Sequence, residues 1–494
     1  MKVNKTLLAV LSIFLIALVF ISSASAADTN KVTDLSIDES GPLKSNEDIG
    51  FTNSEDGTVT PISNVANSTV GTYTDLQKLI DESNKTIDLD KNYEYNAKID
   101  GKNFTKGVAI NKELVIDGKG YSISGNNAYR IFNIGTNANV ELKNINFINS
   151  NDRAVYFKSI GSVENCTFEN NIASSGAALY FENYGVVSKS TFKGNNATTS
   201  NGGAICFDGN GTVSDCTFIN NEAKLSGGAI YFGGNGPSTL VNSVFTTNTA
   251  GSSGGAVFFS GSKKGTGNVT NCNFKDNTAA VKGNAIYISS GEISGSTFTD
   301  NGRDSSYAIY TSGTLALNKN KVSNGIYNDG TITTPIKVTV CKGKTYNVKY
   351  GEVVSLNATV TDNDGNYIYD SSFYFTVEGN NITATPGDKI YTADYTFKVI
   401  DEVSVGMGSL KDTDLIVKNA TFNVAAPSII AEDLVKMYKN DTQYKATFFN
   451  ETGAYLPDGT VVKFYLNGKT YERKISGGKL IVNVATPLAS VVRL

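Results

Sequence analysis

Two consecutive stretches decide the fold of this chain: residues 202–221, GGAICFDGNGTVSDCTFINN, and residues 227–248, GGAIYFGGNGPSTLVNSVFTTN. Each begins with a Gly-Gly-Ala-Ile segment, passes through turns rich in Gly and Asn, and ends with a Phe followed three residues later by Asn. Apolar and polar residues alternate along short runs, as in β-strands, and no amphipathic helical stretch separates the runs. Strands that recur without helical crossovers predict a coiled β-solenoid.

The repeat extends on both sides of these stretches. The marker Phe returns every 21 to 29 residues, a period that fits one coil, at Phe147, Phe168, Phe192, Phe218, Phe245, Phe274 and Phe298. Coils of a parallel β-helix stack about 4.8 Å apart, so equivalent residues form columns along the axis. One column is Asn171, Asn195, Asn221, Asn248, Asn277 and Asn301. Its carboxamides are expected to hydrogen-bond from coil to coil at a turn.

A second column accepts only small side chains. It consists of Cys166, Ser190, Cys216, Ser243, Cys272 and Ser296. Its cysteines lie on alternate coils, about 9.6 Å apart, which exceeds the roughly 7 Å between Cα atoms that a disulfide spans. We therefore expect these cysteines to be unpaired, buried fillers, and nothing suggests a partner for the other two, Cys206 and Cys341.

Composition excludes several kinds of chemistry. The 494 residues include no His and no Trp, so nucleophiles activated by His, zinc sites containing His and Trp platforms for sugars are ruled out. The net charge of -4 and the pI near 5.3 argue against a nucleic-acid partner, which would need a clustered basic face. We expect no cofactor and no metal site.

The N-terminus has the pattern of a secretory signal. Lys2 and Lys5 precede an apolar run at 7–21, and small residues follow at 24–26, which predicts a signal peptide over residues 1–26. An uncleaved anchor is the alternative, and no later apolar stretch is long enough to span a membrane. Residues 27–72 have no sustained period and are interpreted as a flexible leader. Thr74 and Gln77 then form a capping-box pattern for a short helix that would cap the solenoid.

The chain is predicted to contain three further parts. The solenoid with its helical cap occupies residues 73–334, and the strands after it suggest an Ig-like β-sandwich at 335–426. A second, incomplete Ig-like sandwich follows at 427–494. The segment 362–366, DNDGN, bears a faint likeness to a calcium loop but lacks the distal Glu, so we interpret it as a hairpin turn.

The repeats carry a family resemblance. Coils with the FxxN and GGA[ILV] patterns resemble those of polymorphic outer-membrane and adhesin-type β-helices. Together with the opening at 73–147 and an Ig-like unit containing VKMYKNDT at 435–442, they resemble adhesin-like surface proteins of methanogenic archaea. The resemblance implies a right-handed parallel β-helix of the pectate-lyase type, displayed on the cell surface by Ig-like domains.

An enzymatic alternative has to be weighed, because parallel β-helices also house polysaccharide lyases and glycoside hydrolases. Such enzymes need convergent carboxylates, or cationic residues with calcium ligands. The acidic residues of the coils mostly occupy different columns: Asp152, Glu164, Glu169, Glu182, Asp208, Asp215, Glu222, Asp276, Glu292 and Asp300. Asp152 with Arg153 is interpreted as a solvated surface pair. We therefore expect that the protein is not an enzyme.

The candidate binding residues form a third column. Its aromatic members are Tyr156, Tyr180, Tyr231, Phe258, Tyr287 and Tyr310, and Cys206 occupies the same column between Tyr180 and Tyr231. Alternation places the preceding aliphatic residues in the core, so this column is expected to face outward. An outward aromatic column suits a glycan or a protein partner, and the alternative is that it only packs under turns or stabilises the sheet.

These observations favour a secreted protein, extracellular or on the cell surface. Its expected role is adhesion, by binding a polysaccharide or a surface protein of another cell or of the envelope. A purely structural component of the cell envelope is a further alternative.

Overall fold

The computed structural model describes residues 51–52, 60–61, 70–260, 266–302, 307–425, 429–431, 443–450, 453–466, 469–483 and 492–493. Two compact units divide the chain, 1–66 and 67–494. In the first unit, β1 (Phe51–Thr52) and β2 (Thr60–Pro61) pair antiparallel. The signal peptide predicted at 1–26 lies outside the described residues, as does most of the leader predicted at 27–72.

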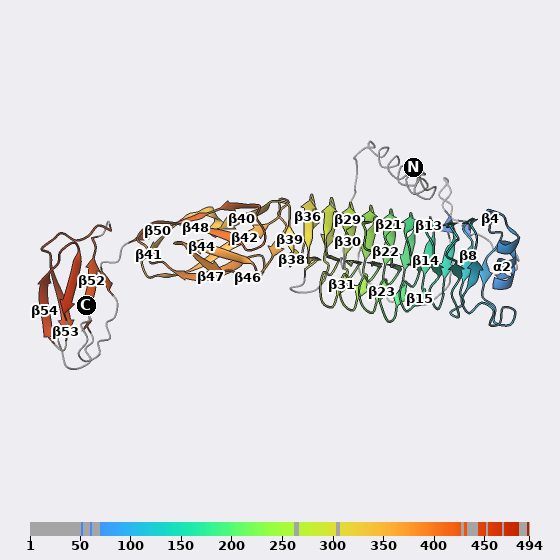
Figure 1. Ribbon diagram of the computed structural model, residues 1–494, viewed down its shortest axis with the longest axis horizontal. Helices are drawn as coiled ribbons and strands as arrows, with labels where there is room; N and C mark the ends of the chain where they lie inside the picture. The colour runs from blue at the N-terminus through green and yellow to red at the C-terminus, as the bar shows by residue number, and fades with distance from the viewer. Residues whose placement is uncertain are drawn as a thin grey trace, which may run out of the picture. The chain divides into compact units, whose positions relative to one another are not determined.

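The second unit opens with a solenoid of three long parallel sheets (Figure 1), which confirms the predicted all-β solenoid. Each sheet contains eleven strands, one from each coil, except that the last strand of sheet 1 comes from the sandwich that follows the solenoid. Sheet 1 comprises β6 (Val108–Ile110), β9 (Phe132–Ile134), β12 (Val155–Phe157), β16 (Leu179–Phe181), β20 (Ile205–Phe207), β24 (Ile230–Phe232), β28 (Val257–Phe259), β32 (Ile286–Ile288), β35 (Ile309–Thr311), β38 (Ile326–Asn328) and β43 (Ile368–Tyr369).

The other two long sheets follow sheet 1 within each coil. Sheet 2 comprises β4 (Thr86–Asp88), β7 (Leu114–Asp117), β10 (Val140–Lys143), β13 (Gly161–Glu164), β17 (Gly185–Ser188), β21 (Gly211–Ser214), β25 (Ser238–Val241), β29 (Gly267–Thr270), β33 (Gly291–Ser294), β36 (Thr314–Asn318) and β39 (Thr331–Ile332). Sheet 3 comprises β3 (Gly71–Thr72), β5 (Tyr93–Glu94), β8 (Ser122–Ser124), β11 (Asn146–Ile148), β14 (Thr167–Glu169), β18 (Thr191–Lys193), β22 (Thr217–Ile219), β26 (Val244–Thr246), β30 (Asn273–Lys275), β34 (Thr297–Thr299) and β37 (Lys321–Val322). The shorter sheet 4 comprises β15 (Ile172–Ala173), β19 (Asn196–Ala197), β23 (Glu222–Ala223), β27 (Thr249–Ala250) and β31 (Thr278–Ala279).

Columns of identical side chains fill the solenoid interior. The marker phenylalanines of sheet 3 stack with ring centroids 4.7–4.9 Å apart. A second stack, which the sequence analysis did not identify, runs through sheet 1 with centroids 4.4–5.0 Å apart, at Phe157, Phe181, Phe207, Phe232 and Phe259. Glycines that begin strands of sheet 2 make room for it: a Cβ on Gly185 would lie 2.5 Å from the Phe181 ring.

The two polar columns behave as predicted. Each buried Asn of the first column except Asn301, the last, donates its Nδ2 to the Oδ1 of the Asn in the next coil at 2.9 Å. In the Cys and Ser column, a backbone N–H donates to the side chain one coil further, as from Cys166 to Ser190 Oγ at 3.1 Å and from Ser190 to Cys216 Sγ at 3.4 Å. All five cysteines are free and buried, which confirms the expectation that they are unpaired.

A helix closes the N-terminal end, although its cap differs from the prediction. Helix α2 (Tyr73–Glu82) is capped by Thr72 with Asp75, two residues before the predicted Thr74 and Gln77. The predicted pattern was wrong because Gln77 is used elsewhere: it exchanges hydrogen bonds of 3.0 and 2.8 Å with the backbone of Ala109 in β6. These bonds give partners to backbone groups of β6, the edge strand of sheet 1. The solenoid also starts at β3, inside the residues assigned to the leader.

Two five-stranded sheets follow the solenoid and pack together as a β-sandwich, the architecture predicted for residues 335–426. One comprises β46 (Thr385–Pro386), β47 (Tyr391–Thr396), β42 (Val353–Thr361), β40 (Ile336–Val340) and β49 (Leu415–Lys418). The other comprises β41 (Thr345–Lys349), β50 (Ala420–Ala425), β48 (Asp401–Ser409), β44 (Phe373–Val377) and β45 (Asn380–Thr383), and a 3-10 turn, η1 (Cys341–Gly343), precedes β41.

The described remainder of the chain has its own small core around Phe448 and Phe464. It contains two three-stranded sheets: β51 (Ile429–Ala431), β52 (Gln443–Phe448) and β55 (Lys479–Asn483) form one, and β54 (Lys469–Lys474), β53 (Val461–Leu466) and β56 (Val492–Arg493) form the other.

The sandwich caps the C-terminal end of the solenoid. Its strand β43 extends sheet 1 by pairing in parallel with β38. The segment 362–366 is a turn closed by an antiparallel bridge between Thr361 and Tyr367, which confirms the predicted hairpin turn. In this turn Asn366 accepts from the Val322 N–H at 2.8 Å and donates to the Asn320 carbonyl at 3.0 Å. Two backbone groups, one in β37 and one just before it, thus find partners outside the coils.

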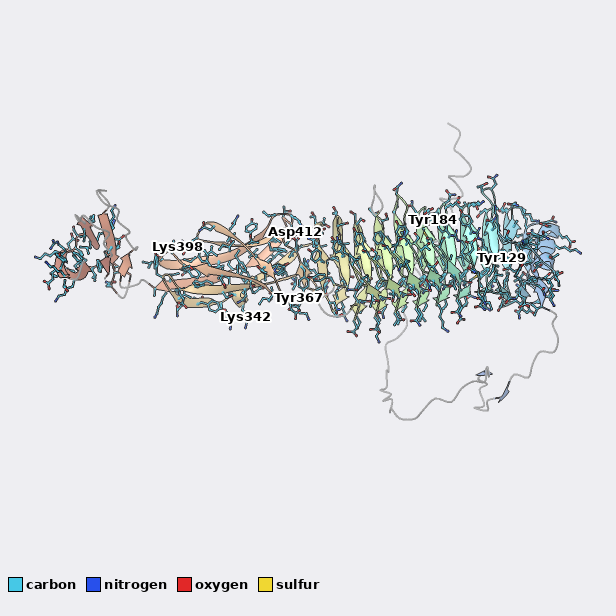
Figure 2. The ribbon with its side chains drawn as sticks, turned by 90° about the horizontal axis from the view of Figure 1, so that it is seen from below. Tyr129, Tyr184, Lys342, Tyr367, Lys398 and Asp412 are labelled. Carbon is cyan, nitrogen blue, oxygen red and sulfur yellow. The ribbon has the colours of Figure 1, made fainter. Side chains whose placement is uncertain are left out.

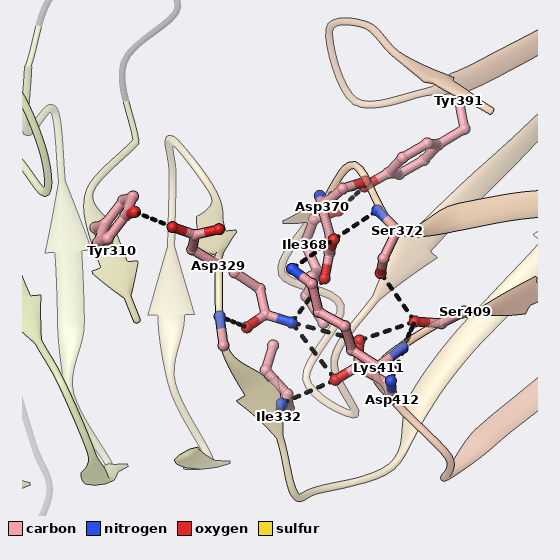
Figure 3. Close-up of polar contacts among 12 residues, drawn as sticks. Tyr310, Asp329, Ile332, Ile368, Asp370, Ser372, Tyr391, Ser409, Lys411 and Asp412 are labelled. Atoms are coloured by element: carbon pink, nitrogen blue, oxygen red, sulfur yellow. Dashed lines mark hydrogen bonds and ion pairs between the residues drawn. The ribbon is translucent and has the colours of Figure 1, made fainter. Parts of the chain in front are cut away.

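Buried carboxylates reinforce this junction (Figure 3). Asp412 accepts from the backbone N–H of Ile332 at 2.9 Å, and Asp370 accepts from Asn328 Nδ2 at 3.0 Å and from Lys411 Nζ at 3.3 Å. Burial, followed by the nearby Asp370, raises the pKa of Asp412. Figure 2 shows Asp412 where the solenoid passes into the sandwich.

Candidate functional site

The outer face of sheet 1 carries the aromatic column. In its strands the middle side chain lies between two buried neighbours and points away from the core, as β12 illustrates. The preceding aliphatic residues are fully buried, which confirms the predicted inner positions: Val155, Leu179, Ile205, Ile230, Val257, Ile286 and Ile309. Five of the proposed binding residues are partly exposed and lie on this one surface: Tyr156, Tyr180, Tyr231, Phe258 and Tyr287.

Tyr310 departs from the predicted outward exposure, because only 4% of it is accessible. Lys282 Nζ donates to the Tyr310 hydroxyl at 2.6 Å and lies 4.3 Å from the ring centroid, while the hydroxyl donates to Asp329 at 2.7 Å. The column continues beyond it to Tyr327 and Tyr369, which the sequence analysis missed. The Ile-Tyr pair at 326–327 repeats the pair at 309–310 and could have revealed Tyr327.

The aromatic column is interrupted at Cys206. Downstream, the rings stack continuously, with centroids 5.4 Å apart between Tyr231 and Phe258 and 4.5 Å between Phe258 and Tyr287. Cys206 fills the position between Tyr180 and Tyr231, so these two rings lie two strand spacings apart, about 9.6 Å. Elsewhere each stacked ring covers its neighbour, whereas at Cys206 the small side chain leaves a gap between two aromatic rings.

A hollow of about 390 Å³ occupies this gap. Hydroxyl and amide groups from the loops before β16 and β20 form part of its wall, and one carboxylate belongs to it. Its lining comprises Arg153, Tyr156, Ser174, Ser175, Tyr180, Thr199, Ser200, Asn201, Cys206, Asp208 and Tyr231. We refer to it as the Cys206 hollow. Small-ligand sites combine apolar or aromatic side chains with polar groups that orient the ligand, and both kinds line this hollow.

Two arginines converge beside the hollow. The Arg130 guanidinium pairs with Asp152 at 2.7 Å and lies 4.7 Å from the Tyr156 ring centroid. Arg153 lies 5.0 Å from the Tyr156 centroid and 4.6 Å from that of Tyr180, and its side chain is only 10% exposed. The interpretation of Asp152 and Arg153 as a solvated surface pair was therefore wrong for Arg153. Sequence reasoning missed its burial because the next coil supplies the Tyr180 ring that covers it.

The tyrosine hydroxyls near the hollow are engaged by carboxylates. Tyr156 donates to Glu182, and Tyr180 donates to Asp208, each one coil further along. Burial, followed by the hydrogen bond to Glu182, raises the pKa of Tyr156 to about 12. The pKa of Tyr180 is raised further by the same two causes, burial and its carboxylate partner. These bonds fix the ring orientations.

A second hollow of about 390 Å³ lies further along the same column. Two aromatic rings and a row of serines line it: Phe258, Ser260, Tyr287, Ser289, Ser290, Ser312 and Gly313. Here the Tyr287 hydroxyl donates to Ser312 at 3.1 Å. The outer face of sheet 1 thus offers two neighbouring hollows with uncharged hydroxyls beside aromatic rings.

Within the described ranges, no group of three or more Cys, Asp and Glu side chains could hold a metal ion. Nor does that part of the chain contain a helix long and apolar enough to cross a bilayer.

Comparison with known proteins identifies the architecture of the coils. Residues 129–293 match the family model described as right handed beta helix region. This part of the chain is a right-handed β-helix. It includes the Cys206 hollow and nearly all of the partly exposed aromatic column. No curated protein matches the sequence.

Two solved structures show weak likeness to the chain. FdeC, described as a novel broadly conserved Escherichia coli adhesin eliciting protection against urinary tract infections, is 17% identical, with a TM-score of 0.17. That match covers 31% of this chain and 65% of the FdeC chain. The tandem Ig repeats of Dlar are 10% identical, with a TM-score of 0.15, over 31% of this chain and 82% of theirs.

Proposed function

We propose that this protein is a secreted adhesin-like protein that binds a glycan through the outer face of sheet 1 without cleaving it. The observation that carries the proposal is the interruption of the aromatic column at Cys206. A sugar ring inserted there would lie between Tyr180 and Tyr231, restoring the stacking that the column has elsewhere.

The polar lining of the Cys206 hollow suits a carbohydrate. Sugar hydroxyls need both donors and acceptors, and the hollow supplies serine and threonine hydroxyls, the carboxamide of Asn201 and the carboxylate of Asp208. Tyr156 and Tyr180 already donate their hydroxyls to carboxylates, so their rings are held in place before a ligand arrives. Groups ordered in advance lose little conformational entropy on binding.

The carboxylates near the hollow support binding without cleavage. Asp208 is the one carboxylate among the described residues that line it. Glycoside hydrolases usually act through two carboxylates that flank the scissile bond. A single carboxylate that accepts a tyrosine hydroxyl can instead orient a sugar hydroxyl.

The setting proposed for this activity is the cell surface or the extracellular space. The signal-peptide pattern at 1–26 supports export, and the acidic balance of charge disfavours nucleic acid as the partner. The ligand would be a polysaccharide of another cell or of the envelope. A surface protein that displays such a glycan would serve equally.

Retention of the full chain on a panel of immobilised cell-wall and host polysaccharides tests the proposal, with new chain ends measured in the same wells. We expect retention without new chain ends. The double variant Tyr180→Ala/Tyr231→Ala should lose retention, whereas Tyr184→Ala, a partly exposed tyrosine outside both hollows, should keep it. Appearance of new chain ends, or full retention of the folded double variant, would overturn the proposal.

A further inference from the structure

The charge of Arg153 indicates which kind of sugar the Cys206 hollow accepts. Its side chain is nine-tenths buried, lines the hollow and lies against the rings of Tyr156 and Tyr180. Its Nε atom is buried and, among the described residues, has no hydrogen-bond partner. An unpartnered donor leaves the charge of the guanidinium incompletely compensated, and an anion that contacts the exposed tenth of the side chain would offset that charge.

The nearby acidic groups do not meet this need. Asp152 lies 3.8 Å from Arg153 Nε, beyond hydrogen-bond distance, and its other oxygen pairs with Arg130 at 2.7 Å. One carboxylate is thus shared by two guanidinium groups. Glu182 and Asp208 accept the hydroxyls of Tyr156 and Tyr180, and neither forms an ion pair with Arg153 within the described part of the chain.

We infer that the Cys206 hollow binds a sugar that bears a carboxylate, with the acid group against Arg153. A guanidinium presents planar, paired donors that match a carboxylate, and bonds between the two are among the stronger hydrogen bonds in proteins. The ring of the same sugar would lie between Tyr180 and Tyr231. The hydroxyl groups of the sugar would form hydrogen bonds with Asp208 and Asn201. This inference rests on the proposed glycan-binding function and adds the chemical class of the ligand.

The test compares each acidic polysaccharide with its own carboxyl-reduced form. Polygalacturonate, alginate and glucuronoxylan serve as probes, and retention of the full chain is measured on both forms of each. We expect at least one acidic form to be retained about ten- to a hundredfold more tightly than its neutral counterpart. Added salt should weaken that retention, because it screens the charge of the ligand.

Variants locate the effect at the hollow. Arg153→Gln should reduce the preference for the acidic form over its carboxyl-reduced form about tenfold or more. Because replacing Arg153 could disturb the packing around it, Ser174→Asp provides a second test. This variant places a negative charge, like that of the ligand carboxylate, on an exposed residue at the rim of the hollow, and should weaken retention of the acidic form. Ala280→Asp is the matched control. Ala280 is also exposed, and it follows β31 of sheet 4 as Ser174 follows β15. Strand β31 lies at the opposite end of sheet 4 from β15.

Each outcome decides one of the two claims. Equal retention of acidic and reduced forms would overturn the carboxylate inference and leave glycan binding intact. Absence of retention on all polymers in both forms would overturn the glycan-binding proposal itself. If folded Ser174→Asp prefers the acidic form as strongly as Ala280→Asp does, the acid group binds away from Arg153. That result would contradict the inference.

Discussion

Two parts of one aromatic column use the same residue type differently. Around Cys206 the rings are partly exposed and separated by a gap, and a guanidinium lies against two of them. Around Tyr310 the rings stack without interruption, and Tyr310 is 4% exposed beneath Lys282 and beside Asp329. One aromatic column thus has a buried, stacked part around Tyr310 and a partly exposed part around Cys206 where the stacking is interrupted.

The largest expected effect contrasts the two parts by truncating one ring in each. Tyr310→Ala should lower the free energy of unfolding by about 3 kcal/mol, because it empties a buried site. Tyr231→Ala, at a partly exposed site, should cost about 1 kcal/mol. Urea unfolding of both variants measures the difference, and equal losses would show that the two parts play the same structural role.

An intermediate effect concerns tyrosine ionisation at the gap. Since the pKa of Tyr156 is about 12 in the folded protein, against about 10 in an unfolded chain, its contribution to stability is complete below pH 10. That contribution is lost as the pH rises through 12. Glu182→Gln removes the carboxylate that accepts the Tyr156 hydroxyl, so the pKa of Tyr156 should fall toward its ordinary value.

The shift can be followed by NMR of ring-labelled tyrosine during an alkaline titration. Glu292→Gln is the control, because Glu292 lies exposed on sheet 2, away from the column. An unchanged pKa of Tyr156 in Glu182→Gln would mean that burial alone raises this pKa.

The smallest expected effect is at the thiols. Burial raises the pKa of Cys206 to about 12, as it does for Cys166, although Cys206 lines the hollow. At neutral pH we expect an alkylating reagent to modify neither thiol in the native protein and both after denaturation. Mass spectrometry checks this, and rapid native modification of Cys206 alone would show that the floor of the gap is more open than the structure indicates.

The interior of the solenoid could be predicted because every coil repeats it. The Phe, Asn and small-residue columns each recur in register, so one correct alignment fixed their positions. The end caps could not be predicted in this way. Thr72 and Asp75, rather than Thr74 and Gln77, cap α2, because the side chain of Gln77 binds the edge strand β6. Likewise β43 joins sheet 1 from within the sandwich, a contact that no local pattern reports.

The candidate site was only half visible in the sequence. The aromatic column and its interruption by Cys206 follow from the alignment, but the consequence of the interruption depends on the distance between coils. Arg153 follows Asp152 directly, which favoured the interpretation of a surface ion pair. Its burial is produced by Tyr180, which is 27 residues away in the chain and one coil away in space. Because the coils differ in length, residues that touch between coils are not separated by a constant number of residues. Such contacts cannot be recognised from neighbouring residues in the sequence.

Closing the gap at Cys206 distinguishes glycan binding between Tyr180 and Tyr231 from binding elsewhere on the protein. Cys206→Tyr introduces the residue that the next coil already carries at Tyr231, so the fold should tolerate it, while Cys206→Ser leaves the gap open. Retention of the two variants and the unaltered chain is compared on the polysaccharide that binds best. We predict that Cys206→Ser is retained like the unaltered chain and that folded Cys206→Tyr is not retained. Equal retention of folded Cys206→Tyr would contradict this prediction and place the binding site elsewhere.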